Sequence, residues 1–512
     1  MSNQSVNNKR IAKNTALLYI RTLFVMFISL YTSRVILSAL GVEDYGIYQV
    51  VGGVVAMFSA ISSSLSNAIS RFLTFEIGHG DKERLKRIFS TSLTIQLLIV
   101  FIILVMSEVI GVWFIETKMQ IPVDRLDAAR WVLHCSLFTF CINLLSIPYN
   151  ACIIAHEHMS AFAYIGVLES VLKLVISYLI IVSPIDKLIF YALLMMLLAL
   201  AIRIIYSIYC NRNFEESRIR PGFDKGIFKE MLGFSGWSLF NNTAFILNNQ
   251  GVNMLMNVYF GVVVNAARGI AVQVENAVLQ FVNNFTTAIN PQIIKSYASG
   301  DLENMHKLVC RGAKFSYFSM LLLALPIIIE AKQILNIWLV DVPDYAVIFV
   351  QLSLIMGLCD SVGNSGYTAC MATGRLKKYS IVITSIAFLE FPLAWFLFSM
   401  NALPQYAYYT YIVVKILILI SRMFLLESMV ELKVSMYVKK VFLPVILTTL
   451  IAVVFPVLLV YIMQPTILRL ITMIIFSVIS VSVSAFYIGM SFNERRIILN
   501  TCQKVVSKFI NK

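Results

Sequence analysis

The chain has 512 residues, of which 59% are hydrophobic and 13% are charged. Soluble globular proteins have roughly 45–50% apolar and about 25% charged residues, so the composition excludes a soluble domain. A formal net charge of +14 can indicate a nucleic-acid partner. Here, however, the cations fall in alternate loops between apolar runs, which is the positive-inside pattern, and no nucleic-acid partner is expected.

Continuous apolar runs predict an all-α integral membrane protein rather than a β-barrel, whose short strands would alternate in hydrophobicity. About 20 apolar residues cross a bilayer as a helix, and the chain contains about fourteen such runs. The predicted transmembrane helices cover residues 14–40, 46–75, 88–115, 127–154, 161–183, 188–210, 232–258, 264–290, 314–339, 346–372, 380–400, 405–428, 440–463 and 467–490.

The loops on one side of the predicted membrane are basic, and those on the other side are short with few cations. Both termini are therefore predicted to be cytoplasmic. The longest loop, residues 211–229, is basic and contains Pro221 and Gly222, as expected of a linker between two lobes.

An internal repeat relates two groups of six predicted helices. Gly41 follows the first run and Gly261 follows the seventh, 220 residues later. At the same offset, GDKE at residues 80–83 matches GDLE at residues 300–303. Duplicated bundles are common in membrane transporters, so the repeat predicts two lobes of similar fold.

A third match aligns YNACIIA at residues 149–155 with YTACMAT at residues 367–373. We therefore predict an N-lobe over residues 1–220, a C-lobe over residues 221–430, and two further helices with a basic tail over residues 431–512. Six spans separate the halves, so both lobes are expected to have the same orientation in the membrane.

The predicted seventh helix is unusually rich in amides, with seven Asn and Gln side chains between residues 233 and 257. At 3.6 residues per turn, Asn242, Asn249 and Asn253 fall on one stripe. Bare amides in hydrocarbon are costly, so the stripe must face other helices or water. The amides could form hydrogen bonds between helices, but their number favours the wall of a polar cavity.

Ionisable residues within the predicted spans cost roughly 2.5–3.5 kcal/mol each at a helix centre, so they indicate pairing or a wet cavity. They are Arg21, Arg34, Arg71, Glu169, Lys173, Arg268, Glu275, Asp360, Glu390 and Lys415. The arginines suit bidentate binding of a phosphate-bearing anion, whereas Arg34, Arg71 and Arg268 could instead snorkel to the interface. Glu169 and Lys173 have the spacing of an intrahelical pair.

The carboxylates Glu275, Asp360 and Glu390 are candidates for coupling to H+ or Na+, and Asp360 could instead only bond the neighbouring backbone or Ser361. The chain has no Gly-rich phosphate loop, nucleophile elbow or His/Cys constellation, so neither an enzyme nor a cofactor is expected. The eight cysteines are scattered, and His156 and His158 have no partner cluster in the sequence, so no metal site is expected either.

Three stretches resemble the polysaccharide branch of the multidrug/oligosaccharidyl-lipid/polysaccharide exporter superfamily. They are RVILSALGVEDYGIYQVVGG (34–53), LGFSGWSLFNN (232–242) and ATGRLKKYS (372–380). The chain resembles a Wzx-type O-antigen or capsule-repeat flippase of that branch, which implies a MATE-like, V-shaped pair of lobes around a cationic cavity.

The resemblance implies alternating-access transfer of undecaprenyl-pyrophosphate-linked oligosaccharide across a bacterial inner membrane. Arg21, Arg71, Arg268 and Arg34 would then line the cavity, and other polysaccharide-assembly proteins could be partners. Ion coupling is permitted by the resemblance.

Three alternatives remain. A cation-coupled multidrug exporter of the same superfamily would favour acidic, aromatic pockets, whereas these spans lean basic. A membrane glycan polymerase or glycosyltransferase would need a substantial outer loop, and every outer loop here is short. A structural or assembly protein would not need amide-lined spans in a duplicated bundle.

Overall fold

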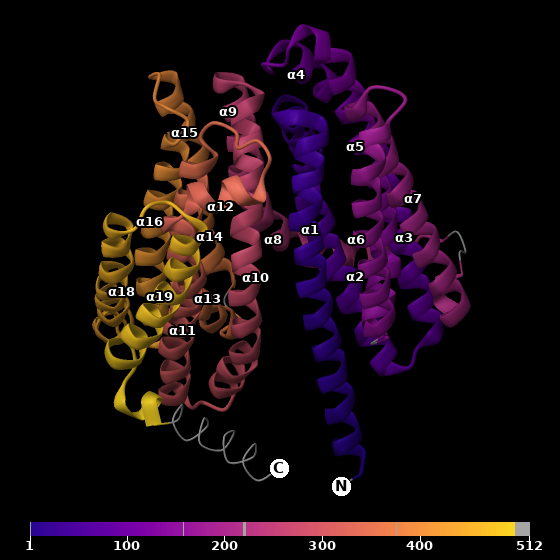
Figure 1. Ribbon diagram of the computed structural model, residues 1–512. Coiled ribbons are helices and arrows are strands. Elements are labelled where there is room, and N and C mark those ends of the chain that lie inside the picture. The colour runs from indigo at the N-terminus through magenta and orange to yellow at the C-terminus, as the bar shows by residue number, and fades with distance from the viewer. Residues whose placement is uncertain (1, 157, 219–221, 375, 497–512) are drawn as a thin grey trace, which may run out of the picture. The chain divides into compact units, whose positions relative to one another are not determined.

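The computed structural model describes residues 2–156, 158–218, 222–374 and 376–496. These residues form helices joined by short loops, without a strand among them (Figure 1). The described part of the chain forms two compact units. The first unit is Met1–Gly269 with Leu339–Asp344 and Ala394–Pro404, and the second is Ile270–Trp338, Tyr345–Leu393 and Gln405–Lys512. The expected division near residues 220 and 430 remains a prediction.

The first unit is built on long helices linked by π- and 3-10 turns. They are α1 (Ser2–Ala56), α2 (Ser59–His79), α3 (Lys82–Met106), η1 (Ser107–Gly111), α4 (Val112–Thr117), η2 (Val123–Arg125), α5 (Leu126–Ala155), α6 (Met159–Leu179), η3 (Ile180–Val182), α7 (Lys187–Asn213), η4 (Glu215–Ser217), α8 (Lys225–Ile246), η5 (Leu247–Gly251), α9 (Val252–Phe260) and the start of α10 (Val262–Ala298).

The second unit contains most of α10 and the helices that follow it. They are α11 (Leu302–Ile329), α12 (Ala331–Trp338), α13 (Ala346–Ala372), α14 (Leu376–Ala387), α15 (Glu390–Ser399), α16 (Tyr406–Val430), α17 (Val434–Tyr437), η6 (Val438–Phe442), α18 (Leu443–Ile462), α19 (Ile467–Ser484) and η7 (Ala485–Gly489). The last residues of α15 belong to the first unit.

The core of the first unit forms around the C-terminal part of α1. Ile47 and Val51 are fully buried there and pack with Val132 and Leu133 of α5 and Leu188 of α7. Side chains on one face of α1 thus hold α5 and α7 in place by removing apolar surface from solvent.

The sequence repeat is also a repeat of local structure. Gly41 and Gly261 both interrupt helices with positive φ, at 81° and 79°. Gly80 and Gly300 end helices with φ of 81° and 75°. Positive φ favours glycine because a Cβ atom would be strained there, which accounts for glycine at all four positions.

The side chains that start the next helices repeat as well. Asp81 accepts a hydrogen bond from the Arg84 backbone N–H at the start of α3, and Asp301 accepts one from the Asn304 N–H at the start of α11. The third matched pair of sequences ends helices α5 and α13. The GDKE and GDLE motifs are therefore equivalent helix caps.

Eleven helical segments among the described residues are long and apolar enough to cross a membrane. The other three predicted spans, residues 46–75, 232–258 and 405–428, also form helices, namely the end of α1 with α2, then α8 to α9, and α16. The all-α membrane fold is confirmed, and a total of fourteen spans remains a prediction.

Replacing Gly41 by alanine should lower the unfolding temperature of the purified protein. No atom lies within 4 Å of the place where the new Cβ would sit, so the effect would come from the left-handed backbone alone. Such strain costs of order 1–3 kcal/mol. Gly52→Ala is the matched control, since its site is equally open and has no positive φ. Equal unfolding temperatures for the two variants would contradict the assignment.

Candidate functional site

Arg268 on α10 is held by the π-turn η5 in the first unit. Its Nη2 donates to the backbone oxygen of Asn249 at 3.0 Å and to Asn249 Oδ1 at 3.1 Å. Arg268 is only 4% exposed. The π-turn places both Asn249 acceptors on one guanidinium nitrogen, so Arg268 is a buried, bonded cation rather than a snorkelling one.

Asn253 joins the same polar region. Asn265 Nδ2 donates to the backbone oxygen of Asn253 at 2.7 Å and to its Oδ1 at 3.0 Å. Asn253 Nδ2 lies 3.0 Å from the position that a Cβ on Gly53 would occupy, and Gln250 Oε1 lies 2.9 Å from it. Glycine at position 53 thus gives the amides room against α1.

Asn242 bonds in a different direction. Its Nδ2 donates to the hydroxyls of Ser63 and Ser64 on α2, at 3.0 and 3.1 Å. The predicted stripe therefore holds helices together: Asn242 reaches α2, whereas Asn249 and Asn253 meet residues of α10. The sequence allowed either hydrogen bonds between helices or the wall of a polar cavity, and the structure shows hydrogen bonds between helices for these amides. Lining of a cavity by these amides remains a prediction.

Arg21 packs inside the first unit against α6. Its guanidinium carbon lies 4.6 Å from the centre of the Phe162 ring. A Cβ at Gly166 would come within 2.5 Å of the guanidinium nitrogens, so the missing side chain makes space for Arg21. Arg34 and Arg71 are exposed, on α1 and α2. The four predicted cavity arginines therefore occupy different environments.

Arg203 on α7 is a functional candidate that the sequence reading missed. Its guanidinium carbon lies 4.0 Å from the centre of the Tyr149 ring on α5. Arg21 and Arg203 are thus both cations over aromatic rings, an arrangement that retains positive charge in an apolar setting. The signal was available, because Arg203 interrupts an otherwise apolar run.

Glu169 and Lys173 form the expected intrahelical pair on α6, with Lys173 Nζ donating to Glu169 Oε1 at 2.6 Å. This pair neutralises itself. Arg21 and Arg203 lie over aromatic rings instead, without an ion pair to a carboxylate among the described residues.

The second unit contains a cluster of opposite charges on α13, α15 and α16. Lys415 Nζ donates to Asp360 Oδ2 at 2.8 Å. Glu390 is 2% exposed and close enough to interact electrostatically with Lys415. Glu275 on α10 is also buried. The structure thus brings Asp360 and Glu390 around one lysine.

Arg422 lies two helical turns beyond Lys415 on α16 and was also missed from the sequence. Its Nε donates to the Tyr379 hydroxyl at 3.0 Å. An ideal Cβ at Gly363 would lie 1.8 Å from Arg422 Nη1, so the absence of a side chain on α13 admits the guanidinium. Tyr379 and Gly363 belong to other helices, and their pairing with Arg422 is invisible in the sequence.

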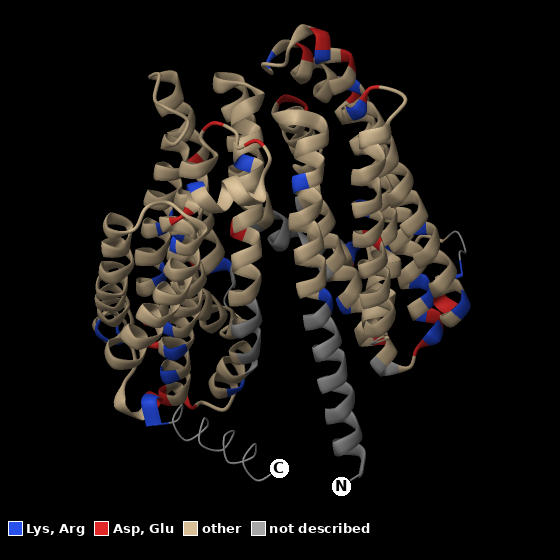
Figure 2. Cartoon of the chain, in the orientation of Figure 1, with Lys and Arg blue, Asp and Glu red and all other residues tan. Residues whose placement is uncertain are grey.

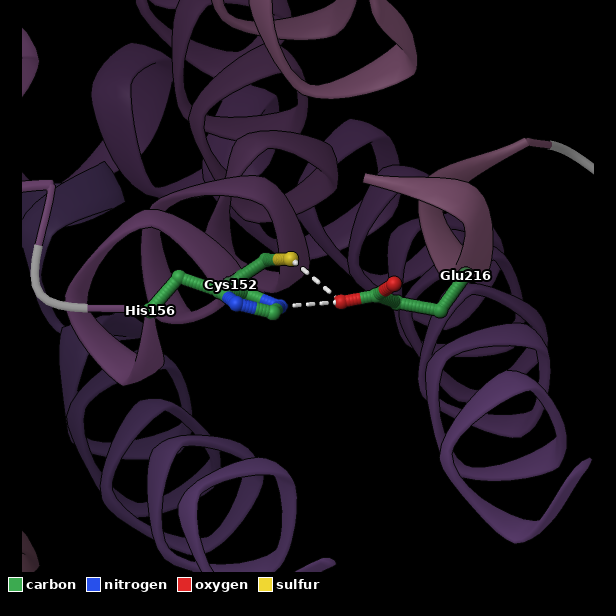
Figure 3. Close-up of side chains that lie close together, drawn as sticks. All are labelled: Cys152, His156 and Glu216. Atoms are coloured by element: carbon green, nitrogen blue, oxygen red, sulfur yellow. Dashed lines mark hydrogen bonds and ion pairs between the residues drawn. The ribbon is translucent and has the colours of Figure 1, made fainter. Parts of the chain in front are cut away.

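Cys152, His156 and Glu216 converge beside the predicted interlobe linker (Figure 3). His156 Nε2 donates to Glu216 Oε1 at 2.5 Å, and Cys152 Sγ donates to the same oxygen at 3.4 Å. The His156 ring stacks on Phe214, with 4.2 Å between centroids. The three residues therefore anchor η4 to the end of α5.

The Cys–His–Glu donor set is one that zinc accepts, although the sequence predicted no metal site. Its ligand atoms lie within 4.8 Å of one another. Two ligands on one tetrahedral zinc would be roughly 3.3 Å apart. The His156–Glu216 separation of 2.5 Å is that of a direct hydrogen bond, so the two side chains bond each other in this arrangement.

Comparison with known proteins gives the class of this fold. Residues 19–179 match the MatE family model. The chain is 22% identical over 327 residues to the uncharacterized membrane protein EpsK of Bacillus subtilis (strain 168), which covers 62% of this chain and 63% of that protein. The alignment therefore spans less than two thirds of that relative.

Two solved structures share the architecture. An inward-facing multidrug resistance MATE family transporter of the MOP superfamily matches with a TM-score of 0.67 and 14% identity, over 81% of this chain and 98% of that one. The lipid II flippase MurJ, in an inward closed conformation, matches with a TM-score of 0.65 and 13% identity, over 92% of this chain and 98% of that one. The fold is that of MATE-type membrane transporters of the MOP superfamily.

Glu216→Gln should loosen η4, measured as backbone hydrogen exchange of residues 214–218. Burial is the largest single effect and raises the pKa of Glu216, but the hydrogen bonds from His156, the backbone and Cys152, with the attraction of His156, together outweigh it and lower the pKa below its ordinary value. The anchor is therefore complete above the ordinary pKa of a glutamate side chain and is lost as pH falls through the lowered pKa of Glu216.

Loss of a charged hydrogen bond predicts exchange about tenfold faster at pH 7 in the variant, and little difference from the unsubstituted protein once Glu216 is protonated in both. Glu215→Gln is the control, because the Glu215 side chain is 64% exposed. If both variants exchange alike at pH 7, the anchor has no stabilising role.

Proposed function

We propose that the protein is a flippase that moves undecaprenyl-pyrophosphate-linked oligosaccharide across the bacterial inner membrane by alternating access. The observation that carries the proposal is the charge within the helices of the first unit. Arg21, Arg203 and Arg268 lie in apolar helices there, and the acid Glu169 is already paired with Lys173. Such a surplus suits an anionic substrate.

The chemistry of the arginines fits a pyrophosphate group. A guanidinium presents a planar set of N–H donors that matches two phosphate oxygens, and it stays charged when partly desolvated. Phe162 and Tyr149 support Arg21 and Arg203 from one side. Their other N–H groups would bind the substrate in this proposal, together with Arg268, Arg34 and Arg71 and the amides Asn242, Asn249 and Asn253.

The length of the chain also supports a lipid-linked substrate. The lipid II flippase structure covers 92% of this chain, and the multidrug transporter covers 81%. The flippase structure thus covers more of this chain than the multidrug transporter does, and this chain has the further helices α18 and α19 after α16. The multidrug exporter is the second candidate, because its TM-score of 0.67 is as high as that of the flippase at 0.65.

The second unit would couple transport to a cation. Lys415 lies with Asp360 and Glu390, so H+ or Na+ arriving at either carboxylate would compete with the lysine ammonium. Displacement of Lys415 from Asp360 would then alter the packing of α13 against α16. Glu275 is the further candidate for this role.

Deleting the gene tests the proposal directly. Lipid-linked oligosaccharide should accumulate in the cytoplasmic leaflet, because synthesis continues while transfer stops. Leaflet-specific labelling of the lipid-linked glycan measures this. The deletion strain is then supplied with Arg21→Lys or Arg21→Ala. Lysine keeps the positive charge but loses the bidentate geometry of arginine, so a larger fall in accumulation with Arg21→Lys than with Arg21→Ala would show that the charge matters.

Arg21→Ala should reduce transfer about tenfold or more at equal membrane abundance, as expected when one charged hydrogen bond to substrate is lost. Arg130→Ala is the control, because Arg130 pairs with Glu116 and Asp127 near the surface. Normal surface glycan in the deletion strain, with loss of cationic-dye efflux instead, would favour the multidrug exporter.

Asp360→Asn should remove the dependence of transfer on a Na+ or proton gradient, with transfer expressed per amount of protein in the membrane. The neutral amide leaves Lys415 without its ion-pair partner and cannot bind a proton at that site. Transfer into proteoliposomes with imposed gradients measures the coupling. Glu427→Gln, at an exposed acid on α16, is the control. Unchanged gradient dependence in Asp360→Asn would assign coupling elsewhere.

A further inference from the structure

A basic pocket of about 520 Å³ lies in the second unit, apart from the charged groups described above. It opens where α11, η6 and the residues after η7 meet. Its charged lining is Lys307, Arg311, Lys314, Lys439, Lys440 and Glu494, five cations and one acid. Figure 2 shows the cations gathered at this end of α11 and its neighbouring helices.

The one acid of the pocket lining, Glu494, is already bonded to two basic residues of the same lining. Lys314 Nζ donates to Glu494 Oε2 at 2.8 Å and to the Gly489 carbonyl at 3.0 Å. Arg311 Nε lies 3.4 Å from Glu494 Oε1. Glu494 therefore fixes Lys314 and Arg311 as the rigid inner wall, and it has little capacity left for the other cations.

The outer wall of the pocket carries two lysines that form no ion pair with Glu494. Lys439 and Lys440 project from the π-turn η6 and are exposed, and neither forms an ion pair with an acid of the described residues. Lys307 pairs with Glu303 outside the pocket lining. Glu303 interacts electrostatically with Lys440 but is already paired with Lys307. The lining therefore keeps a net positive charge, which suits an anion.

The pocket lies at a membrane boundary. Its lining residues come from the start of the candidate span Val434–Ile462 and from the end of the span Ile467–Gly489. These two span ends lie at the same face of the bilayer. Pro444 and Ile488 add an apolar edge. Tyr487 and Phe492, next to the lining, are 64% and 76% exposed, as is typical of side chains at the headgroup level.

We propose that this pocket binds the phosphate of an anionic phospholipid from the leaflet on the side of the basic loops. The cations would hold the phosphate, and the apolar edge at Pro444 and Ile488 would contact the start of the acyl chains. Basic pockets between transmembrane helices on the cytoplasmic side recognise acidic headgroups by this chemistry. A soluble phosphate would share the cations but would gain nothing from the apolar edge.

The test uses the full chain in nanodiscs of phosphatidylcholine with increasing phosphatidylglycerol. The lipid retained by the protein is counted by native mass spectrometry, and the unfolding temperature is followed in parallel. The unsubstituted protein should retain phosphatidylglycerol and unfold at a higher temperature as its fraction rises. Lys439→Gln with Lys440→Gln should weaken retention about 25-fold, since each lysine near an anionic surface contributes about fivefold.

Lys377→Gln with Lys378→Gln is the matched control, because it removes two adjacent exposed lysines from the start of α14 in the same unit. Equal loss of lipid retention in both double variants would mean general attraction to the surface and would overturn the site.

A separate experiment adds inorganic phosphate to the protein in pure phosphatidylcholine. If phosphate raises the unfolding temperature as much as phosphatidylglycerol does, and if this increase depends on Lys439 and Lys440, the pocket binds a soluble anion and the lipid proposal is wrong. If the glutamine double variant does not fold, Lys439→Arg with Lys440→Arg replaces it. This variant keeps both charges and should retain phosphatidylglycerol, and failure to do so would contradict the site.

Discussion

The need to compensate charge inside apolar helices determines how this protein is built. Arg268 meets Asn249, Lys415 meets Asp360, and Arg422 meets Tyr379 across helix boundaries. An ionised group at a helix centre costs several kcal/mol when unpaired, about as much as a small domain can tolerate. Each pair therefore specifies which helices must be neighbours, a task that apolar side chains alone perform with less specificity.

The two units solve this problem differently. The first places cations over aromatic rings, as Arg21 and Arg203 show, and so keeps a positive interior. The second surrounds Lys415 with carboxylates and balances its charge. A positive interior suits an anion, whereas a balanced cluster can respond to a small cation. The proposed division between substrate binding and coupling follows from this contrast.

Much of the fold could be predicted from the sequence because its signals are local. Apolar runs define helices, and Gly41 and Gly261 carry a backbone conformation that only glycine adopts easily. The site was less accessible. Arg422 depends on a missing Cβ at Gly363 in a different helix, and the amides of η5 take their partners from a π-turn rather than a regular helix. Their distribution between helices could not be read from a 3.6-residue period.

The repeat has a consequence for the history of the chain. Turns such as those at Gly80 and Gly300 have kept their backbone shape and their capping aspartates, while the ionisable residues between them have diverged. The two copies thus share a scaffold but carry different ionisable residues within it. Two initially equivalent halves could then acquire separate chemical duties without any alteration of the architecture that they inherited.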